Sequence, residues 1–275
     1  MKQAICNEMY GERPLAEVCR SVRSIGYAGI EISPFTLAPC PADISAVQRR
    51  EYRDIIAASG LGFVGLHWLM FSPPGLHVTG PDRALRERSW RHIDELIDLC
   101  ADLGENGVMV FGSPKQRSTT AGATVEEATR RMEEGLAEVS SHAMQRGVTI
   151  LLEALPGSQA DVVRTLEEAV RIVRSIASPA IGTMFDTHNA EDETEPHAGL
   201  IDRYFDYIRH IHVNERDGRR PGTGGYDFAA VLNALKRRNY GGWVSLEVFD
   251  FSEGAGNIAR ESLRYLKSVT EQLAE

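Results

Sequence analysis

Four side chains that could hold a metal ion stand where four expected strands end. Each follows a short apolar run, and the four are Glu153, Asp186, His212 and Glu247. Three carboxylates and one imidazole suit Mn²⁺, Mg²⁺, Co²⁺ or Zn²⁺ better than a metal that prefers thiolates. If the strands are parallel neighbours in one barrel, their carboxyl ends converge on one cavity. A divalent ion there would polarise the carbonyl and hydroxyl oxygens of a substrate.

Each of these residues also has an ordinary explanation when it is taken alone. A glutamate at the end of a strand is most often a surface or salt-bridge residue, and His212 would serve as a hydrogen-bonded interior histidine. The joint pattern is harder to explain in that way, because burying three carboxylates together without a cation is very costly. The sequence therefore predicts a shared metal site.

Short runs rich in β-branched residues alternate with amphipathic stretches from one end of the chain to the other. Strands are expected near residues 3–6, 28–32, 61–66, 107–111, 148–152, 180–185, 208–212 and 243–248. Helices are expected near residues 14–25, 43–59, 82–103, 124–146, 161–177, 197–206, 226–238 and 255–273. The helix at 124–146 has the clearest pattern, since Thr124 and Glu127 form a capping box and Gly147 follows its last turn.

Eight strand–helix pairs with nearly continuous apolar strands predict a (β/α)₈ TIM barrel, an α/β fold, with residues 1–275 as a single domain. A doubly wound open sheet is the alternative. That fold would need a glycine-rich phosphate loop after the first strand, and residues 7–10 do not form one. The loops after strands, such as 67–81, are longer than the loops after helices, and in barrels such loops build the active site.

The composition narrows the class of protein. The chain has 275 residues, of which 43% are hydrophobic and 25% charged, as in an ordinary globular protein. A net charge of −9 disfavours nucleic acid as a partner, because attraction to phosphates dominates that kind of binding. The four cysteines have no metal-binding spacing and are interpreted as free thiols. Without a signal peptide or an apolar stretch of roughly 18 residues, a cytoplasmic protein with no membrane partner is expected.

Several segments resemble the xylose-isomerase-like TIM barrels of sugar isomerases and epimerases, in particular the D-tagatose 3-epimerase type and its inosose-processing relatives. They are GIEI at 29–32, LLEAL at 151–155, FDTH at 185–188, IHVNE at 211–215, PGTG at 221–224 and SLE at 245–247. The resemblance spans nearly the whole chain and extends to the intervals between the four ligand candidates. It implies a metal-dependent sugar or cyclitol isomerase or epimerase that moves a proton through an enediolate.

The resemblance also implies roles for individual residues. One divalent ion, expected to be Mn²⁺ with Mg²⁺, Co²⁺ or Zn²⁺ as alternatives, would be bound by Glu153, Asp186, His212 and Glu247. Glu153 and Glu247 would also be the catalytic acid/base pair, which takes a proton from one face of a substrate carbon and returns one to the other. By resemblance or by position near strand ends, the substrate-binding candidates are His188, His67, Trp68, Lys115, Glu215 and Arg216.

Two departures from the family pattern concern the substrate. The family tends to carry an asparagine and a further glutamate soon after Glu153, whereas this chain has ALPGSQ at 154–159. Where similar spacing would place a substrate-binding arginine, this chain has Gly218, and Arg216 is one of three nearby arginines that compete for the role. The substrate contacts are therefore expected to differ from those of a free ketohexose.

Two cations and one aromatic residue near strand ends are less specific signals. Lys115 and Arg117 would either bind a phosphate or carboxylate of the substrate or lie in solvent. Phe249, two residues after Glu247, is expected to be a packing residue.

Other functions use similar residues. A lyase that dehydrates a keto sugar or an inosose would share the first proton abstraction, so the sequence does not separate it from an epimerase. A three-zinc nuclease of the same superfamily would need more histidines at strand ends and a less acidic chain. A sugar-sensing barrel without catalysis would not need an intact ligand set. The substrate is expected to be a small sugar or cyclitol, and the oligomeric state stays open, with a homodimer as one alternative.

Overall fold

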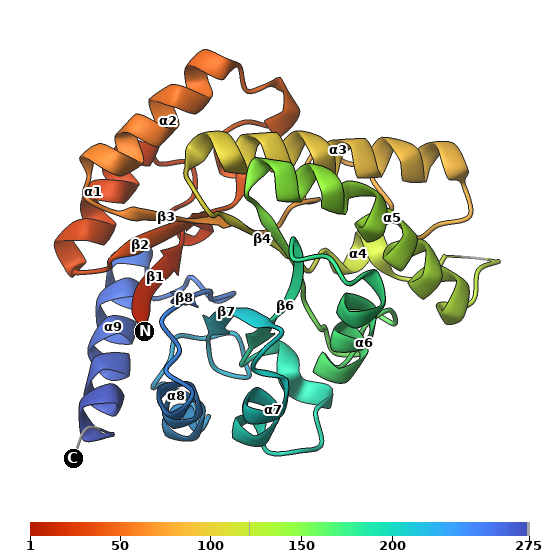
Figure 1. The fold of residues 1–275 in the computed structure, drawn as a ribbon. Helices are drawn as coiled ribbons and strands as arrows, with labels where there is room; N and C mark the ends of the chain where they lie inside the picture. Colours follow the sequence, from red (N-terminus) through yellow and green to blue (C-terminus); the bar gives the residue numbers. More distant parts are fainter. Residues whose placement is uncertain (121, 274–275) are drawn as a thin grey trace.

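Eight parallel strands form a closed barrel in the order in which they occur along the chain (Figure 1). The computed structural model describes residues 1–120 and 122–273. The strands are β1 (Lys2–Cys6), β2 (Gly29–Ile32), β3 (Gly62–Leu66), β4 (Val108–Phe111), β5 (Thr149–Leu152), β6 (Ile181–Asp186), β7 (Ile208–Val213) and β8 (Trp243–Leu246). β1 pairs with β2 on one side and with β8 on the other, which sets Lys2 beside Trp243. The predicted barrel is confirmed, and the doubly wound alternative is wrong.

An outer layer of helices surrounds the barrel (Figure 1). Its helices are α1 (Leu15–Ile25), α2 (Ala46–Ala58), α3 (Arg83–Leu103), α4 (Pro114–Arg117), α5 (Val125–Arg146), α6 (Leu166–Ile176), α7 (His197–Tyr204), α8 (Phe228–Arg237) and α9 (Ala255–Gln272). The predicted helix at 161–177 starts later than expected, because Thr165 caps it by accepting a hydrogen bond from the backbone N–H of Glu168. The short α4 adds to the predicted elements.

Local sequence signals explain why the long helices begin and end where they do. At the start of α5, Thr124 and Glu127 form the predicted capping box, and Gly147 ends the helix with a positive φ of 68°. Ser45 and Gln48 form a second capping box, so α2 begins at Ala46 rather than at residue 43.

The long connections lie at the carboxyl end of the barrel. The connection after β3 covers residues 67–82 and the one after β5 covers 153–165, whereas the connections from helices to the next strands are two to five residues long. The strand ends therefore place polar side chains inside one cavity, and the longer loops surround it.

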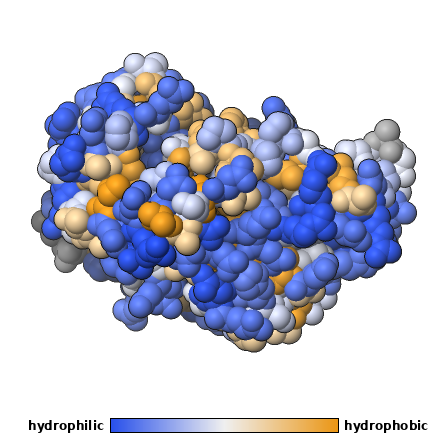
Figure 2. Space-filling model, turned by 90° about the horizontal axis from the view of Figure 1, so that it is seen from above, coloured by the Kyte–Doolittle hydropathy of each residue, from blue (hydrophilic) through white to orange (hydrophobic). Residues whose placement is uncertain are grey.

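The outer surface is mostly polar. The face in Figure 2, which looks onto the α2 and α3 side, is predominantly hydrophilic, and its hydrophobic residues form separate patches. Within the described ranges, no helix combines the length and the apolar character needed to cross a membrane.

Candidate functional site

The four predicted ligand side chains lie together at the carboxyl end of the barrel. One ligand atom from each of Glu153, Asp186, His212 and Glu247 lies within 4.8 Å of the others. The four residues come from or directly follow β5, β6, β7 and β8, and none is more than 5% exposed. The four neighbouring strands thus deliver three carboxylates and an imidazole to one buried point.

The hydrogen bonds around Asp186 and His212 leave one atom of each directed at the cluster. Asp186 Oδ1 accepts from the backbone N–H groups of His188 at 2.6 Å and Asn189 at 3.1 Å. Asp186 Oδ2 is buried and has no hydrogen-bond partner among the described residues. His212 Nε2 lies 3.0 Å from Glu31 Oε1, so its Nδ1 faces Glu247 Oε2 at 3.0 Å and Asp186 Oδ2 at 3.8 Å.

Each of the two glutamates accepts a hydrogen bond from a neighbouring side chain. Glu153 Oε1 accepts from the Asn189 side-chain amide at 2.8 Å. Glu247 Oε1 accepts from the Trp68 indole N–H, also at 2.8 Å. Glycine at position 112 leaves room for Glu153 Oε2, because a Cβ there would force that carboxylate to move. Each glutamate is therefore oriented by a neighbour. Glu153 keeps its second oxygen for other contacts, whereas Glu247 Oε2 lies 3.0 Å from His212 Nδ1.

The electrostatics show repulsion among these carboxylates. Burial, followed by the charges of Asp186 and Glu247, raises the pKa of Glu153 to about 8. Burial and Glu247 raise the pKa of Asp186 to about 6. Burial acts to raise the pKa of Glu247, but His212 together with His67 and Trp68 outweighs it and lowers that pKa to about 2. Asp186 Oδ2 has no hydrogen-bond partner in the described part of the chain, and the pKa values of Glu153 and Asp186 are both raised. This arrangement fits a site for a divalent cation, whose charge would relieve the repulsion between the carboxylates.

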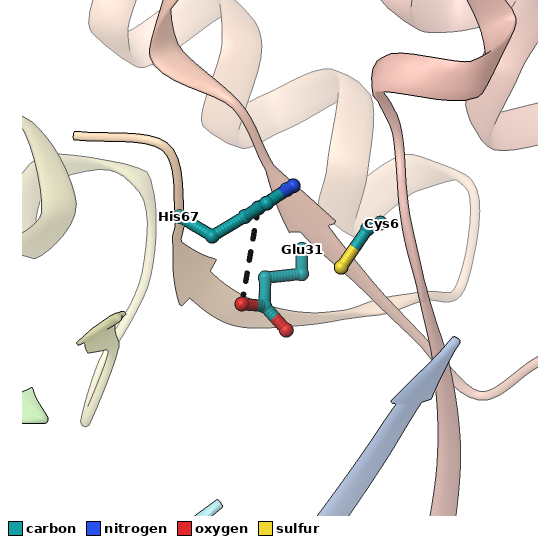
Figure 3. A group of neighbouring side chains, drawn as sticks. All are labelled: Cys6, Glu31 and His67. Carbon is teal, nitrogen blue, oxygen red and sulfur yellow. Dashed lines mark ion pairs between the residues drawn. The ribbon is translucent and has the colours of Figure 1, made fainter. Parts of the chain in front are cut away.

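A second layer of polar side chains lies beneath the four ligand candidates. Glu31 on β2 is completely buried and accepts from two histidines of β7, His210 at 2.8 Å and His212 at 3.0 Å. Figure 3 shows the side chains of His67 and Glu31 turned toward one another, with the sulfur of Cys6 directed at the same carboxylate. His67 Nδ1 lies 3.8 Å from Glu31 Oε1. Because Glu31 holds His212 through Nε2, it fixes which ring nitrogen faces the cluster.

A cavity of about 650 Å³ opens above the cluster. Of the predicted substrate-binding residues, His67, Trp68, Lys115 and His188 line it, together with Glu153 and Glu247. Phe249 also lines it: this residue is 39% exposed, and its ring centroid lies 4.9 Å from that of His188. The expectation that Phe249 is a packing residue agrees with these ring contacts, but it missed that the side chain also forms part of the cavity wall.

Glu215 and Arg216 lie elsewhere. They line a neighbouring cavity of about 760 Å³ and are not among the residues that surround the first one. The Glu215 carboxylate accepts from the backbone N–H groups of Gly222 at 2.9 Å and Tyr226 at 3.1 Å. Glu215 therefore organises the loop before α8, and the structure does not bring either residue to the four ligand candidates.

Arg117 corrects another sequence interpretation. It is completely buried, so it neither lies in solvent nor reaches a substrate. Its guanidinium donates to the carbonyl oxygens of Glu153 at 2.7 Å and Val163 at 3.0 Å, which ties α4 to the chain at the end of β5. Burial lowers the pKa of Arg117 to about 10, so the group stays charged at neutral pH.

Replacing Arg117 by methionine is expected to lower the free energy of unfolding by about 2–4 kcal/mol, because several buried carbonyl groups lose their donor. Urea unfolding of the wild type and the variant measures this. Lys115→Met is the matched control, since Lys115 lies in the same short helix but is exposed. Its effect should stay within about 0.5 kcal/mol. Equal effects in the two variants would contradict the structural role of Arg117.

Comparison with known proteins agrees with this geometry. A family model described as xylose isomerase-like TIM barrel matches residues 19–269. An L-ribulose 3-epimerase of Mesorhizobium japonicum is 28% identical over 256 residues, covering 90% of this chain and 80% of the relative. A 3-dehydro-D-guloside 4-epimerase of Escherichia coli is 22% identical, covering 98% of this chain and all of the relative. A crystal structure of D-psicose 3-epimerase with D-tagatose from Clostridium cellulolyticum H10 superposes with a TM-score of 0.84 at 21% identity, covering 98% of this chain and 99% of that one.

Proposed function

Because this chain belongs to the xylose isomerase-like TIM barrel family, we propose that it is an enzyme that epimerises or isomerises a keto sugar or cyclitol with the help of one divalent metal ion. The epimerase names of its relatives support the sugar epimerase or isomerase class. The observation that carries the metal-dependent proposal is the buried cluster of Glu153, Asp186, His212 and Glu247, in which Asp186 Oδ2 lacks a partner.

The four clustered residues would hold the ion. When bound, it would supply positive charge beside the carbonyl and hydroxyl oxygens of the substrate, where negative charge develops as a neighbouring proton leaves. Oxygen ligands with one nitrogen favour Mn²⁺ as the ion. The charge also relieves the repulsion that raises the pKa values of Glu153 and Asp186.

Glu153 and Glu247 are proposed to move the proton. They follow β5 and β8, which are three strands apart around the ring, so they approach the cavity from different sides. Asn189 and Trp68 each orient one glutamate through a single oxygen, and the other oxygen would take a proton from a substrate carbon or return one. In Glu247 that other oxygen lies 3.0 Å from His212 Nδ1. His188 and Lys115 on the cavity wall are proposed to contact substrate oxygens.

The uptake of deuterium from heavy water tests this function. A panel of ketoses, inososes and 3-keto-glycosides is incubated with the Mn²⁺-loaded protein and analysed by mass spectrometry and chromatography. We expect deuterium at a carbon next to the carbonyl and a new stereoisomer, both abolished by a chelator. Net loss of water from a substrate would instead indicate the lyase alternative. No contact described in the site favours that alternative over an epimerase. Absence of exchange across the panel would contradict the proposal.

Two further parts of the proposal concern the setting of the enzyme. A cytoplasmic location is supported by the four cysteines, all of which are free thiols in the structure. A homodimer is proposed as the assembly, and sedimentation measurements decide between it and a monomer.

The metal-free protein is expected to lose stability as the pH rises from about 5 to about 8. Burial raises the folded-state pKa of Glu153 to about 8 and that of Asp186 to about 6, so both carboxyls bind protons more tightly in the folded chain than in the unfolded chain. The contribution of these two carboxyls to the free energy of unfolding is fully present at a pH below the pKa values of the unfolded chain. It is lost as the pH rises through the raised pKa values of the folded chain. Glu247, with its lowered pKa, acts only at lower pH.

Thermal unfolding across this pH range, with chelator or with Mn²⁺, measures the effect. Bound Mn²⁺ should remove most of the loss, because the cation favours the deprotonated carboxylates. The same pH dependence with and without Mn²⁺ would show that these carboxyls do not form the metal site.

A further inference from the structure

The cavity above the proposed metal site has a wall made of aromatic side chains. Trp68, Phe71 and Phe249 all line it. The ring centroids of Trp68 and Phe71 lie 5.4 Å apart and those of Trp68 and Phe249 lie 6.4 Å apart, so the three rings form one continuous surface. Phe35 supports this aromatic wall from behind Phe71, at a centroid distance of 4.4 Å.

The aromatic wall is exposed where it leaves the cavity. Phe71 is 56% exposed and Phe249 is 39% exposed, so together they form an exposed apolar patch of the kind that marks a binding site. Trp68 is held with a positive φ of 54°, a conformation that a bulky residue rarely adopts and that persists only where the surroundings enforce it. The wall is therefore an ordered surface, continuous from the site to its rim.

The size of the cavity exceeds what a single sugar requires. Its volume of about 650 Å³ lies in the middle of the range of about 300–1,000 Å³ that is usual for drug-sized ligands. A keto sugar bound over the four clustered residues would fill the deep part and leave the rim beside Phe71 and Phe249 empty.

The chemistry of the aromatic wall indicates what would fill the rim. The only side-chain hydrogen-bonding atom among its three residues is the indole N–H of Trp68, and Glu247 already accepts from it at 2.8 Å. The hydroxyl groups of a second sugar would find no partner on this wall, whereas an aromatic ring needs none and gains from offset or edge-to-face stacking.

We propose that the substrate is a keto sugar carrying an aromatic aglycone, with the sugar over the Glu153–Glu247 site and the aglycone against Trp68, Phe71 and Phe249. This inference rests on the proposed function for the sugar part. The reaction itself is unchanged by the aglycone: a carbon-bound proton leaves, a proton from solvent returns, and no oxidation or bond cleavage occurs.

Matched phenyl and methyl glycosides of the same 3-keto sugars test the aglycone site. With the Mn²⁺-loaded protein, kcat/KM for deuterium exchange should be about ten-fold higher for the phenyl compound. Phe71→Ala and Phe249→Ala should bring the phenyl-to-methyl ratio close to one. Phe251→Ala is the control, since Phe251 is 41% exposed in the same region but is not among the residues that line the cavity. It should leave the ratio unchanged.

The outcomes separate this inference from the proposed function. If the wild type exchanges the methyl compound and its phenyl-to-methyl ratio of kcat/KM is near one, the aromatic site is overturned. The proposed epimerase function is then still supported. If no keto sugar exchanges, calorimetric binding of unreactive phenyl and methyl glucosides decides: tighter phenyl binding that Phe71→Ala abolishes supports the site, and equal binding overturns it. If Phe71→Ala changes the sedimentation coefficient but leaves the phenyl-to-methyl ratio unchanged, Phe71 forms a contact between subunits. That result also overturns the proposal.

Discussion

Replacing Glu153 or Glu247 by glutamine is expected to lower turnover by about a hundred-fold or more while most of the metal stays bound. Glutamine keeps the size of the side chain and one potential ligand oxygen, but it cannot take a proton from carbon, and general acid–base catalysis contributes about 10²–10⁴-fold. Deuterium exchange gives the rate, and elemental analysis of the dialysed protein gives the metal content.

Glu105→Gln is a suitable control for these two variants, because Glu105 lies exposed in the turn between α3 and β4. It should leave both the rate and the metal content unchanged. If both active-site variants bind metal normally and exchange at the wild-type rate, the base lies elsewhere. His188, which lines the same cavity, would then be the residue to replace.

Asp186→Asn is expected to remove metal and activity together. The change deletes a full negative charge from a buried site, and its amide group can present N–H where Asp186 Oδ2 now lacks a partner. Affinity should fall by more than about ten-fold, since even partners outside the ligand set change affinity by about 10–100-fold. Metal titration of the purified variant measures this, with Asp206→Asn as the control because Asp206 is 85% exposed at its side chain.

Stability distinguishes this effect from misfolding. Without metal, Asp186→Asn should be at least as stable as the wild type above about pH 6, because it removes a carboxylate whose pKa is raised to about 6 by burial and by Glu247. A variant that retains wild-type metal content and activity would refute the ligand assignment.

The sequence predicted the fold and the ligand cluster because both leave local signals. The strands are four to six residues long, and β5 and β6 are largely apolar runs whose end is marked by a carboxylate at the carboxyl end of the barrel. Glu153 and Asp186 are found in this way without knowledge of their neighbours. The start of α5 was predicted because Thr124 and Glu127 form a capping box that is visible in the local sequence.

The second layer could not be predicted in this way, because its contacts join distant strands. Glu31 lies inside the apolar segment of β2, and its partner His210 is 179 residues away. Only closure of the barrel brings β2 and β7 across the interior from one another. The burial of Arg117 was not predicted, because it depends on α4, a helix too short to leave a periodic pattern in the sequence. The place of Phe249 on the cavity wall was not predicted either, because the exposure of a side chain depends on the tertiary structure.

The pairing of β1 with β8 has a consequence for synthesis of the protein on the ribosome. β1 emerges well before β8, the strand that closes the barrel against it. At about 5–20 residues per second, the edge of β1 waits roughly ten to fifty seconds for its partner. Glu247 arrives with that strand, so the nascent chain has only three of the four proposed ligands until β8 has emerged. Acquisition of the metal by the complete set of proposed ligands would therefore follow the emergence of β8.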